Sequence, residues 1–424
     1  MHDISWIDQA LSSVRPQVVG ALMRYFRDLD TAEEAFQEAC LKALRNWPQK
    51  GPPRDPAAWL IFVGRNAAID TIRKSSRNVA LPDEEKLSDL DDAEPSMAER
   101  LDNADYRDDV LRLLFICCHP DLPATQQIAL ALRIVSGLTV PEIARAFLVS
   151  EAAMEQRITR AKRKVAAAGV PFETPSAVER VERIASVAAM VYLLFNEGYS
   201  ASGGDAHIRE PLCDEAIRLG YLLLRLYPGE PELMGLTALM LFQHARAPAR
   251  IDAEGEIVLL EEQDRGLWRG KLIAEAGALI EKAARHGRAG SYQLQAAIAY
   301  EHAKAKTAAD TDWITIDKYY QILEQLTPSP VVTLNRAVAV SKHAGPEEAL
   351  ALIEPLADAL AGYFHFHGVR GAFLQQLGRV REARGAYEKA ISIANTPAEA
   401  AHIRRHLDRL QQPESGRHAL APPG

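Results

Sequence analysis

The most reactive side chains of this 424-residue chain adjoin in one place, the sequence Cys117-Cys118-His119. Thiolates and imidazoles bind zinc, and an accessible thiolate of low pKa can sense oxidants. Adjacent residues of a helix point in different directions, however, and no second cysteine pair follows at zinc-finger spacing. We therefore expect two buried cysteines and a helix-ending His-Pro with no metal site, and we keep redox sensing as a minor hypothesis.

No pattern in the sequence predicts catalysis. The chain lacks a phosphate-cradling glycine loop, a nucleophile elbow and the histidine pair of a zinc protease. His365 and His367 lie two positions apart, and a structural role is the simpler explanation for both. We expect no catalytic residue, no metal and no cofactor, and the protein is not expected to be an enzyme by itself.

Charged side chains, in contrast, are arranged for recognition near residue 160. Thr139 and Glu142 have capping-box spacing before a short apolar helix, and Ser150 is suited to cap a second helix, so the segment resembles a helix-turn-helix. The second helix carries a basic stripe of Arg157, Arg160 and Lys164 opposite its apolar face, and Lys162 and Arg163 are adjacent to that stripe. Such a stripe fits the major groove of DNA, although a solvated amphipathic helix has the same pattern.

A second charged helix is expected earlier in the chain. Asp55-Pro56 predicts a capped helix start. The helix that follows places four polar residues at i, i+4, i+7 and i+11: Asn66, Asp70, Arg73 and Arg77. Cations at its end, including Lys74, also suit the helix dipole, so DNA contact and dipole complementarity are about equally favoured.

A third helix is predicted from Thr31 and Glu34, which have capping-box spacing. Its apolar residues share one face, and Glu34, Gln37 and Glu38 lie on another. Amphipathicity alone makes solvent the simplest explanation for that polar face. Residues 46–55 (NWPQKGPPRD) then predict a turn-rich connection.

The net charge of −8 hides an uneven distribution along the chain. Residues 1–80 carry 11 Lys/Arg and 9 Asp/Glu (+2), residues 81–109 carry 3 and 12 (−9), residues 110–170 carry 8 and 4 (+4), and the remaining 254 residues carry 27 and 32 (−5). This asymmetry indicates a front half that binds nucleic acid.

The same sequence favours a reduced cytoplasmic protein that does not enter a membrane. Its four cysteines have no disulfide-framework spacing, and its N-terminus lacks the pattern of a signal peptide. The longest nearly apolar run, residues 184–195, is about a third too short to span a bilayer.

Five parts are expected along the chain, and nowhere is there a convincing series of alternating strands, so the expected fold class is all-α. The acidic stretch has the composition of a flexible linker, and Gly and Pro interrupt the helical pattern at residues 169–175. The parts are a helical domain at 1–80, an acidic linker at 81–109, a helix-turn-helix domain at 110–170, a C-terminal helical domain at 171–412 and a disordered tail at 413–424.

Within the C-terminal domain a pattern recurs after 34 residues, which is the tetratricopeptide period. The series Ala337, Val340, Ala349 and Ile353 recurs as Gly371, Leu374, Ala383 and Tyr387. Gly378 would turn the later helix pair, and Pro397 would follow it. These signals predict an α-solenoid of tetratricopeptide-like helix pairs, whose concave surface suits a protein or peptide partner.

Two blocks of the front half resemble regions 2 and 4 of extracytoplasmic-function (ECF) sigma factors, the promoter-recognition subunits of bacterial RNA polymerase. The first is DTAEEAFQEACLKAL followed by PAAWLIFVGRNAAIDTIRK, and the second is QQIALALRIVSGLTVPEIARAFLVSEAAMEQRITRAKRK. The segments FICCHPDL and VERIASVAAMVYLLFNEGYSASGG resemble one ECF subgroup. That subgroup has a C-terminal extension with tetratricopeptide-like repeats, and its genes often neighbour DGPF-type, YCII-related proteins.

The resemblance implies three sets of contact residues. Docking on core RNA polymerase, at the β′ clamp helices, would involve Glu33, Glu34, Gln37 and Glu38. Recognition and melting of the minus-ten element would involve the loop at residues 47–54 with Trp59, Arg65, Asn66, Asp70, Arg73, Lys74 and Arg77. Recognition of the minus-thirty-five element would involve Ser150, Gln156, Arg157, Arg160, Lys162, Arg163 and Lys164. Ala153 and Glu155 stand where many members have a small polar and a basic residue.

The sequence therefore predicts a sigma factor that binds core RNA polymerase, through its β′ clamp helices and β flap, and promoter DNA. It would direct transcription initiation and be regulated by its own C-terminal extension. Two alternatives stay open: a stand-alone helix-turn-helix regulator with a repeat sensor, and a tetratricopeptide scaffold whose front helices bind only protein. The promoter sequence, the inducing signal and the sign of the regulation are not predicted.

Overall fold

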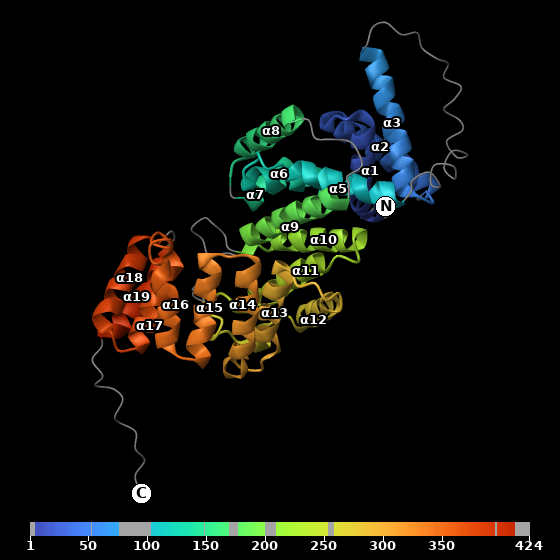
Figure 1. Cartoon of the computed structure of the whole chain (residues 1–424). Helices are drawn as coiled ribbons and strands as arrows, with labels where there is room; N and C mark the ends of the chain where they lie inside the picture. Colours follow the sequence, from blue (N-terminus) through green and yellow to red (C-terminus); the bar gives the residue numbers. More distant parts are fainter. Residues whose placement is uncertain are drawn as a thin grey trace. The chain divides into compact units, whose positions relative to one another are not determined.

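The computed structural model describes residues 5–51, 53–75, 103–147, 149–168, 177–199, 209–252, 258–394 and 397–411. Helices dominate, and no β-strand occurs among these residues, so the predicted all-α fold is confirmed (Figure 1). The chain divides into two compact units, Met1–Leu194 and Phe195–Gly424, and the division falls inside a helix. The two units are described separately below.

Unit 1 contains two groups of helices. In the first group, the first three helices pack on one another, and the helix labelled α5 packs on the first of them. In the second group, three shorter helices pack together. The bounds are α1 (Ser5–Phe26), α2 (Leu29–Lys50), α3 (Pro56–Ser75), α5 (Asn103–Cys117), α6 (Ala124–Ile134), α7 (Val140–Ala146), α8 (Glu151–Ala168) and α9 (Ala177–Tyr199), whose last residues belong to unit 2.

Helix α2 begins one turn earlier than the sequence suggests. Its N-cap is Asp28, whose carboxylate accepts hydrogen bonds from the backbone N–H (2.8 Å) and the hydroxyl (2.6 Å) of Thr31. The predicted capping box of Thr31 and Glu34 is therefore wrong, because Asp28 already satisfies a free N–H of the first turn. Phe36 and Ala39, on the predicted apolar face, are buried as expected.

The connection between α2 and α3 is shorter than the predicted loop at residues 46–55. Helix α2 continues through Pro48 and ends at Gly51, which has φ of 81° and donates its N–H to the carbonyl oxygen of Trp47 (2.9 Å). Trp47 is 2% exposed, and its ring centroid lies 5.4 Å from that of Trp59. Burial of this indole holds the last turn in a helix despite the proline.

Helix α3 is positioned by a cap and a glycine. The carboxylate of Asp55 accepts a hydrogen bond from the N–H of Ala58 (3.0 Å), which confirms the predicted helix start. At Gly64, an added Cβ would lie 2.7 Å from the carbonyl oxygen of Ala35 in α2. The missing side chain thus allows the backbones of α2 and α3 to approach closely.

Helix α5 begins inside the range predicted as the acidic linker; residues 76–102 lie outside the described part of the chain. Asp109, the last residue of that predicted linker, is 3% exposed. Its carboxylate pairs with Arg24 of α1 (3.3 Å) and with Arg112 (2.9 Å). Two arginines therefore fix an acidic residue that composition alone assigned to a flexible segment.

Unit 2 is a series of helices. From α13 (Ser291–Lys304) onward, each α-helix packs on the next one along the chain (Figure 1). The α-helices after α9 are α10 (Glu210–Leu226), α11 (Pro231–Ala245), α12 (Gly270–Ala284), α13 (Ser291–Lys304), α14 (Trp313–Leu326), α15 (Pro330–His343), α16 (Pro346–Ile353), α17 (Phe364–Gln376), α18 (Val380–Ser392) and α19 (Pro397–Gln411). Short 3-10 helices are η2 (Ala247–Ala249), η3 (Arg265–Leu267), η4 (Ala308–Asp310) and η5 (Glu354–Leu356).

The 34-residue repeat corresponds to two helix hairpins, α15–α16 and α17–α18. Gly378 has φ of 72° and makes the turn between α17 and α18. An added Cβ at Gly371 would lie 2.6 Å from the ring of Tyr387, so a small residue is required where these two helices touch. The equivalent positions in the first hairpin, including Ala337 and Ile353, are also buried.

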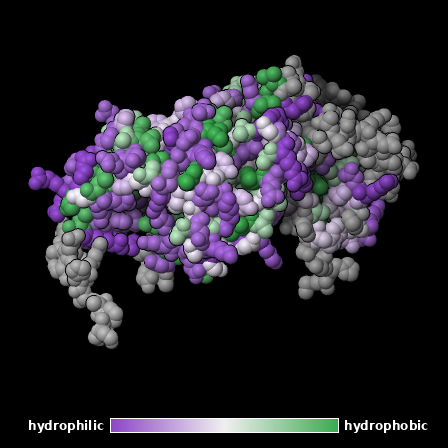
Figure 2. Space-filling view, turned by 60° about the horizontal axis from the view of Figure 1, so that its bottom comes forward, coloured by the Kyte–Doolittle hydropathy of each residue, from purple (hydrophilic) through white to green (hydrophobic). Residues whose placement is uncertain are grey.

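The surface shows no continuous apolar band on the face drawn in Figure 2, where hydrophobic side chains are scattered among hydrophilic ones. Scattered exposed apolar residues are normal on a folded protein. In the described part of the chain, no helix combines the length and the apolar character needed to cross a membrane.

Candidate promoter and polymerase interface

Helices α7 and α8 form the predicted helix-turn-helix. Thr139 and Glu142 make a reciprocal capping box, with the Glu142 carboxylate accepting from the Thr139 N–H (2.7 Å) and the Thr139 hydroxyl accepting from the Glu142 N–H (3.4 Å). Ser150 caps α8 by accepting a hydrogen bond from the N–H of Ala153 (3.3 Å). The predicted apolar face of α8 is buried: Met154, Ile158, Ala161 and Val165.

The polar residues predicted on α8 fall into two groups. Four side chains are exposed, namely Gln156, Arg160, Arg163 and Lys164. Two are half-buried: Arg157 lies over the ring of Phe147 at 5.9 Å, and Lys162 is turned toward α2. The exposed group forms a basic surface that is accessible to a phosphate backbone.

Of the residues predicted to contact the minus-ten element, Trp59, Arg65, Asn66 and Asp70 lie on α3. Trp59 is half-exposed beside Trp47, and the Arg65 guanidinium lies 4.7 Å from the ring centroid of Tyr25. Asn66 is half-buried and Asp70 is exposed. The side chains of Arg73 and Lys74 and the whole of Arg77 lie outside the described residues.

The predicted polymerase-binding residues on α2 do not share one environment. Glu34, Gln37 and Glu38 are exposed, whereas Glu33 is 4% exposed. Glu33 therefore does not lie on the accessible face in this structure, because its carboxylate is held by cations from three other helices, α1, α6 and α8.

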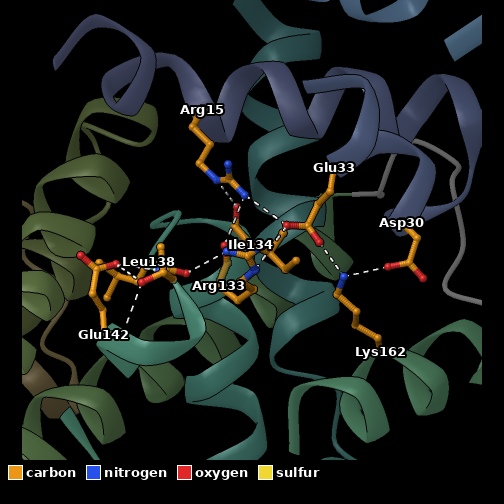
Figure 3. A network of polar contacts seen from close by, with 9 residues as sticks. Arg15, Asp30, Glu33, Arg133, Ile134, Leu138, Glu142 and Lys162 are labelled. Atoms are coloured by element: carbon orange, nitrogen blue, oxygen red, sulfur yellow. Dashed lines mark hydrogen bonds and ion pairs between the residues drawn. The ribbon is translucent and has the colours of Figure 1, made fainter. Parts of the chain in front are cut away.

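A network of ion pairs and hydrogen bonds joins α1 and α2 to α6 and α8 (Figure 3). Lys162 of α8 donates to Glu33 (2.6 Å) and to Asp30 (2.7 Å) of α2. Arg15 of α1 lies 3.2 Å from the other carboxylate oxygen of Glu33, and Arg133 of α6 approaches that same oxygen at 3.9 Å. We call these five residues the interhelix clasp.

Arg15 also binds the backbone at the end of α6. Its Nε donates to the carbonyl oxygen of Ile134 (3.0 Å), and its Nη2 donates to that of Arg133 (3.3 Å). The last carbonyls of a helix are free acceptors at the negative end of its dipole, so a guanidinium is well suited to this position. An added Cβ on Gly137 would lie 2.8 Å from the Arg15 side chain.

Electrostatics favour the charged form of the lysine in this network. Burial alone would lower the pKa of Lys162, but hydrogen bonds to Asp30 and Glu33 and their charges raise it above its ordinary value. A raised lysine pKa stabilises the folded contact at neutral pH, and the stabilisation is lost only as the pH rises through that raised pKa. Lys162 is therefore charged at physiological pH.

The two cysteines near this network are buried and protonated. Cys117 is fully buried and Cys118 is 6% exposed, as predicted. Burial raises the pKa of Cys118 to about 12 and that of Cys117 well above its usual value, so both thiols stay protonated. The described residues contain no group of three or more metal-ligating side chains.

Three members of the clasp were not predicted from the sequence: Arg15, Asp30 and Arg133. The only local signal was the placement of Arg15, a charged residue on the otherwise apolar face of α1 that includes Leu11, Val18 and Leu22. A buried arginine needs a partner, but Glu33 is 18 positions away in the sequence. The carbonyl groups that accept from Arg15 are more than 110 positions away.

Three known family models match parts of this chain. A model of sigma-70 region 2 matches residues 11–78, and a model of sigma-70 region 4 matches residues 112–165. A third model, a family of unknown function (DUF6596), matches residues 183–284. Helices α1, α2 and α3 thus belong to region 2, and α6, α7 and α8 belong to region 4.

Two relatives extend the comparison. An uncharacterized protein of Rhizobium meliloti (strain 1021), R00370, is 67% identical over 410 residues, which are 97% of each chain. The ECF RNA polymerase sigma factor BldN of Streptomyces coelicolor (strain ATCC BAA-471 / A3(2) / M145) is 33% identical over 142 residues, which are 32% of this chain and 50% of BldN.

The fold and the two regions define a sigma-70-type transcription initiation factor. The chain contains sigma-70 regions 2 and 4, followed by a match to a family of unknown function (DUF6596), and part of it is similar to an ECF sigma factor. Its function class is therefore that of a DNA-binding subunit which associates with core RNA polymerase and promoter DNA, and the matched sigma families are non-enzymatic.

Proposed function

We propose that this chain is an ECF sigma factor which, when free of polymerase, holds region 4 on region 2 through the interhelix clasp and opens when it joins core RNA polymerase. We further propose that the C-terminal extension regulates this transition. The observation that carries the proposal is the bond pattern of Lys162, a residue of the DNA-reading helix that donates to Glu33 and Asp30 of region 2.

The spacing of promoter elements supports opening. Regions 2 and 4 of a sigma factor engage the minus-ten and minus-thirty-five elements, which lie about 25 base pairs apart, or roughly 85 Å of B-DNA at about 3.4 Å per base pair. In the structure, atoms of α8 and α2 are 2.6–2.7 Å apart. Both regions cannot engage their elements with the clasp closed.

Contact surfaces are proposed on each region. On α2, the exposed Glu34, Gln37 and Glu38 would dock on the β′ clamp helices, and Glu33 would join them once Lys162 leaves. The proposed minus-ten surface consists of the loop after α2 and Trp59, Arg65, Asn66, Asp70, Arg73, Lys74 and Arg77. The proposed minus-thirty-five surface consists of Ser150, Gln156, Arg157, Arg160, Lys162, Arg163 and Lys164.

Region 4 is also proposed to contact the β flap of the polymerase, and the C-terminal helix pairs are proposed to present a tetratricopeptide-like surface to a protein or peptide. Because the partners are RNA polymerase and promoter DNA, the proposed location is the cytoplasm. The match to region 2 favours this proposal over a stand-alone helix-turn-helix regulator or a scaffold, neither of which requires that region.

Zero-length carbodiimide cross-linking tests the clasp directly, because it joins an amine to a carboxylate only when the two are in contact. We expect the free protein to give a Lys162 cross-link to Glu33 or Asp30, identified by mass spectrometry, and we expect core polymerase to abolish it. The matched control is the ion pair of Lys342 and Glu261 in unit 2 (2.7 Å), which is exposed and has the same chemistry.

Two results would contradict this proposal. If the Lys162 cross-link fails to form in the free protein while the Lys342 control forms, the clasp is absent in solution. If the Lys162 cross-link persists at full yield in an active complex with core polymerase, the clasp does not open on assembly.

A further inference from the structure

Three arginines converge in unit 2 where α11 ends. Arg246 caps the end of α11, Arg250 directly follows η2, and Arg265 begins η3. The guanidinium carbons of Arg246 and Arg265 lie 5.8 Å and 4.6 Å from the ring centroid of the same indole, Trp268. Arg250 lies 3.8 Å from the ring centroid of Tyr199, at the end of α9.

These arginines have no carboxylate partner of the kind that accompanies some other partly buried arginines of the chain. Arg209 pairs with Glu197 (2.8 Å), and Arg336 pairs with Asp317 (2.8 Å). In the described part of the chain, by contrast, no carboxylate oxygen lies within 4.0 Å of a guanidinium nitrogen of the triad: Arg246, Arg250 and Arg265.

The bonds that the triad does make are to neutral groups. Arg250 donates to the carbonyl oxygen of Tyr199 (2.7 Å), and Arg265 donates to the carbonyl oxygens of His302 and Ala305 (3.1 Å for Ala305). Arg246 donates through Nε to the side-chain oxygen of Gln263 (3.3 Å). Carbonyl groups orient a guanidinium but do not neutralise its charge.

The positive charges of the three guanidinium groups repel one another. Burial, together with the nearby charges of Arg250 and Arg265, lowers the pKa of Arg246. Burial and, to a smaller extent, the charges of Arg246 and Arg265 together lower the pKa of His302 to about 4, so this imidazole is neutral at pH 7. Tyr199 and Asp310 are the neighbouring groups that act in the opposite direction, on Arg246 and Arg265 respectively.

A buried donor beside the triad also has no acceptor. Trp268 is 8% exposed, and its indole Nε1 has no hydrogen-bond partner among the described residues. A buried N–H without an acceptor costs free energy, as do like charges held together in a partly buried place. The cost of the like charges falls if an anion binds between the guanidinium groups.

We propose that the triad is a binding site for a small molecule that carries a phosphate or diphosphate group. Guanidinium groups present paired N–H donors that match phosphate oxygens, and three of them suit a multiply charged anion better than a single carboxylate. Tyr199, Trp268 and all three arginines lie within the match to the family of unknown function, residues 183–284. The site would give that domain a ligand, and it does not depend on the proposed clasp.

Binding of diphosphate to the full chain, measured by isothermal titration calorimetry at constant ionic strength, tests the proposal. We expect saturable binding and an increase in Tm of about 5 °C near 100-fold excess over Kd. Arg246→Gln should weaken binding by about 10- to 100-fold, because a charged hydrogen-bonding partner is lost. The control is Arg285→Gln, an exposed arginine at the end of α12, which should bind like the wild type.

Further arms distinguish the source and class of the anion. Inorganic phosphate, diphosphate and ADP separate a free phosphate from the phosphate of a nucleotide, and citrate tests a carboxylate ligand. Binding of citrate as tight as that of diphosphate would overturn the assignment to phosphate. No binding of any phosphate probe, or equal binding by the wild type and by a folded Arg246→Gln variant, would overturn the site itself; circular dichroism reports whether the variant is folded.

Discussion

At the scale of single residues, neighbouring glutamates of one helix have different roles because their partners come from elsewhere in the chain. Glu33 and Glu34 are both acidic and both near the start of α2, and the resemblance to ECF sigma factors assigned both to one docking surface, although helical spacing placed only Glu34 on the polar face. The structure buries Glu33 against Arg15 and Lys162 and leaves Glu34 exposed. Periodicity identifies a polar face, but it cannot show which part of that face another domain will cover.

Substitution of these two glutamates measures the difference. Glu33→Gln removes the charge that compensates Arg15 and Lys162, so we expect the unfolding free energy of unit 1 to fall by about 2–3 kcal/mol. Glu34→Gln is the matched control and should change it by less than about 0.5 kcal/mol. Urea denaturation in a Trp268→Phe, Trp313→Phe background, followed by the fluorescence of the remaining Trp6, Trp47 and Trp59, monitors the unfolding of unit 1. Equal effects of the two substitutions would refute the burial argument.

At the scale of elements, the sequence was informative where the signals are local. The start of α3 at Asp55, the capping box of α7 and the apolar face of α8 were predicted and are present. The end of α2 was missed, because the proline at position 48 suggested a loop while a tertiary contact, the packing of Trp47 on Trp59, keeps the chain helical. Local propensity yields to burial of a large aromatic side chain.

The helix hairpin α17–α18 provides a test at this scale. Gly371→Ala places a Cβ 2.6 Å from the buried ring of Tyr387, so we expect a loss of about 1–3 kcal/mol and faster hydrogen exchange in both helices. Gly385→Ala is the control on α18: nothing lies within 4 Å of its added Cβ, and alanine favours the helix by up to about 1 kcal/mol. If Gly371→Ala proves as stable as the wild type, the two helices do not pack as described.

At the scale of the whole molecule, the sequence predicted the order of the domains better than their limits. Composition suggested a boundary at residues 170–171, where Gly and Pro interrupt the pattern, whereas the compact units divide between Leu194 and Phe195. The reason is tertiary: Arg183 of α9 is 6% exposed, and its guanidinium lies 5.1 Å from the ring centroid of Phe115 in α5. The first part of α9 therefore completes unit 1, which a linker composition cannot reveal.

This division determines how regulation by the extension should be tested. A chain ending after Tyr199 retains all of α9 and the contacts of unit 1, whereas a cut near residue 170 would remove the buried Arg183. In transcription with core polymerase, we expect the shortened chain to differ from the full chain by at least about fivefold, the lower end of typical coupling between sites. Removal of residues 412–424 alone is the control and should leave activity unchanged. Circular dichroism verifies that the shortened chain is folded, and equal activity of a folded shortened chain and the full chain would exclude regulation by the extension.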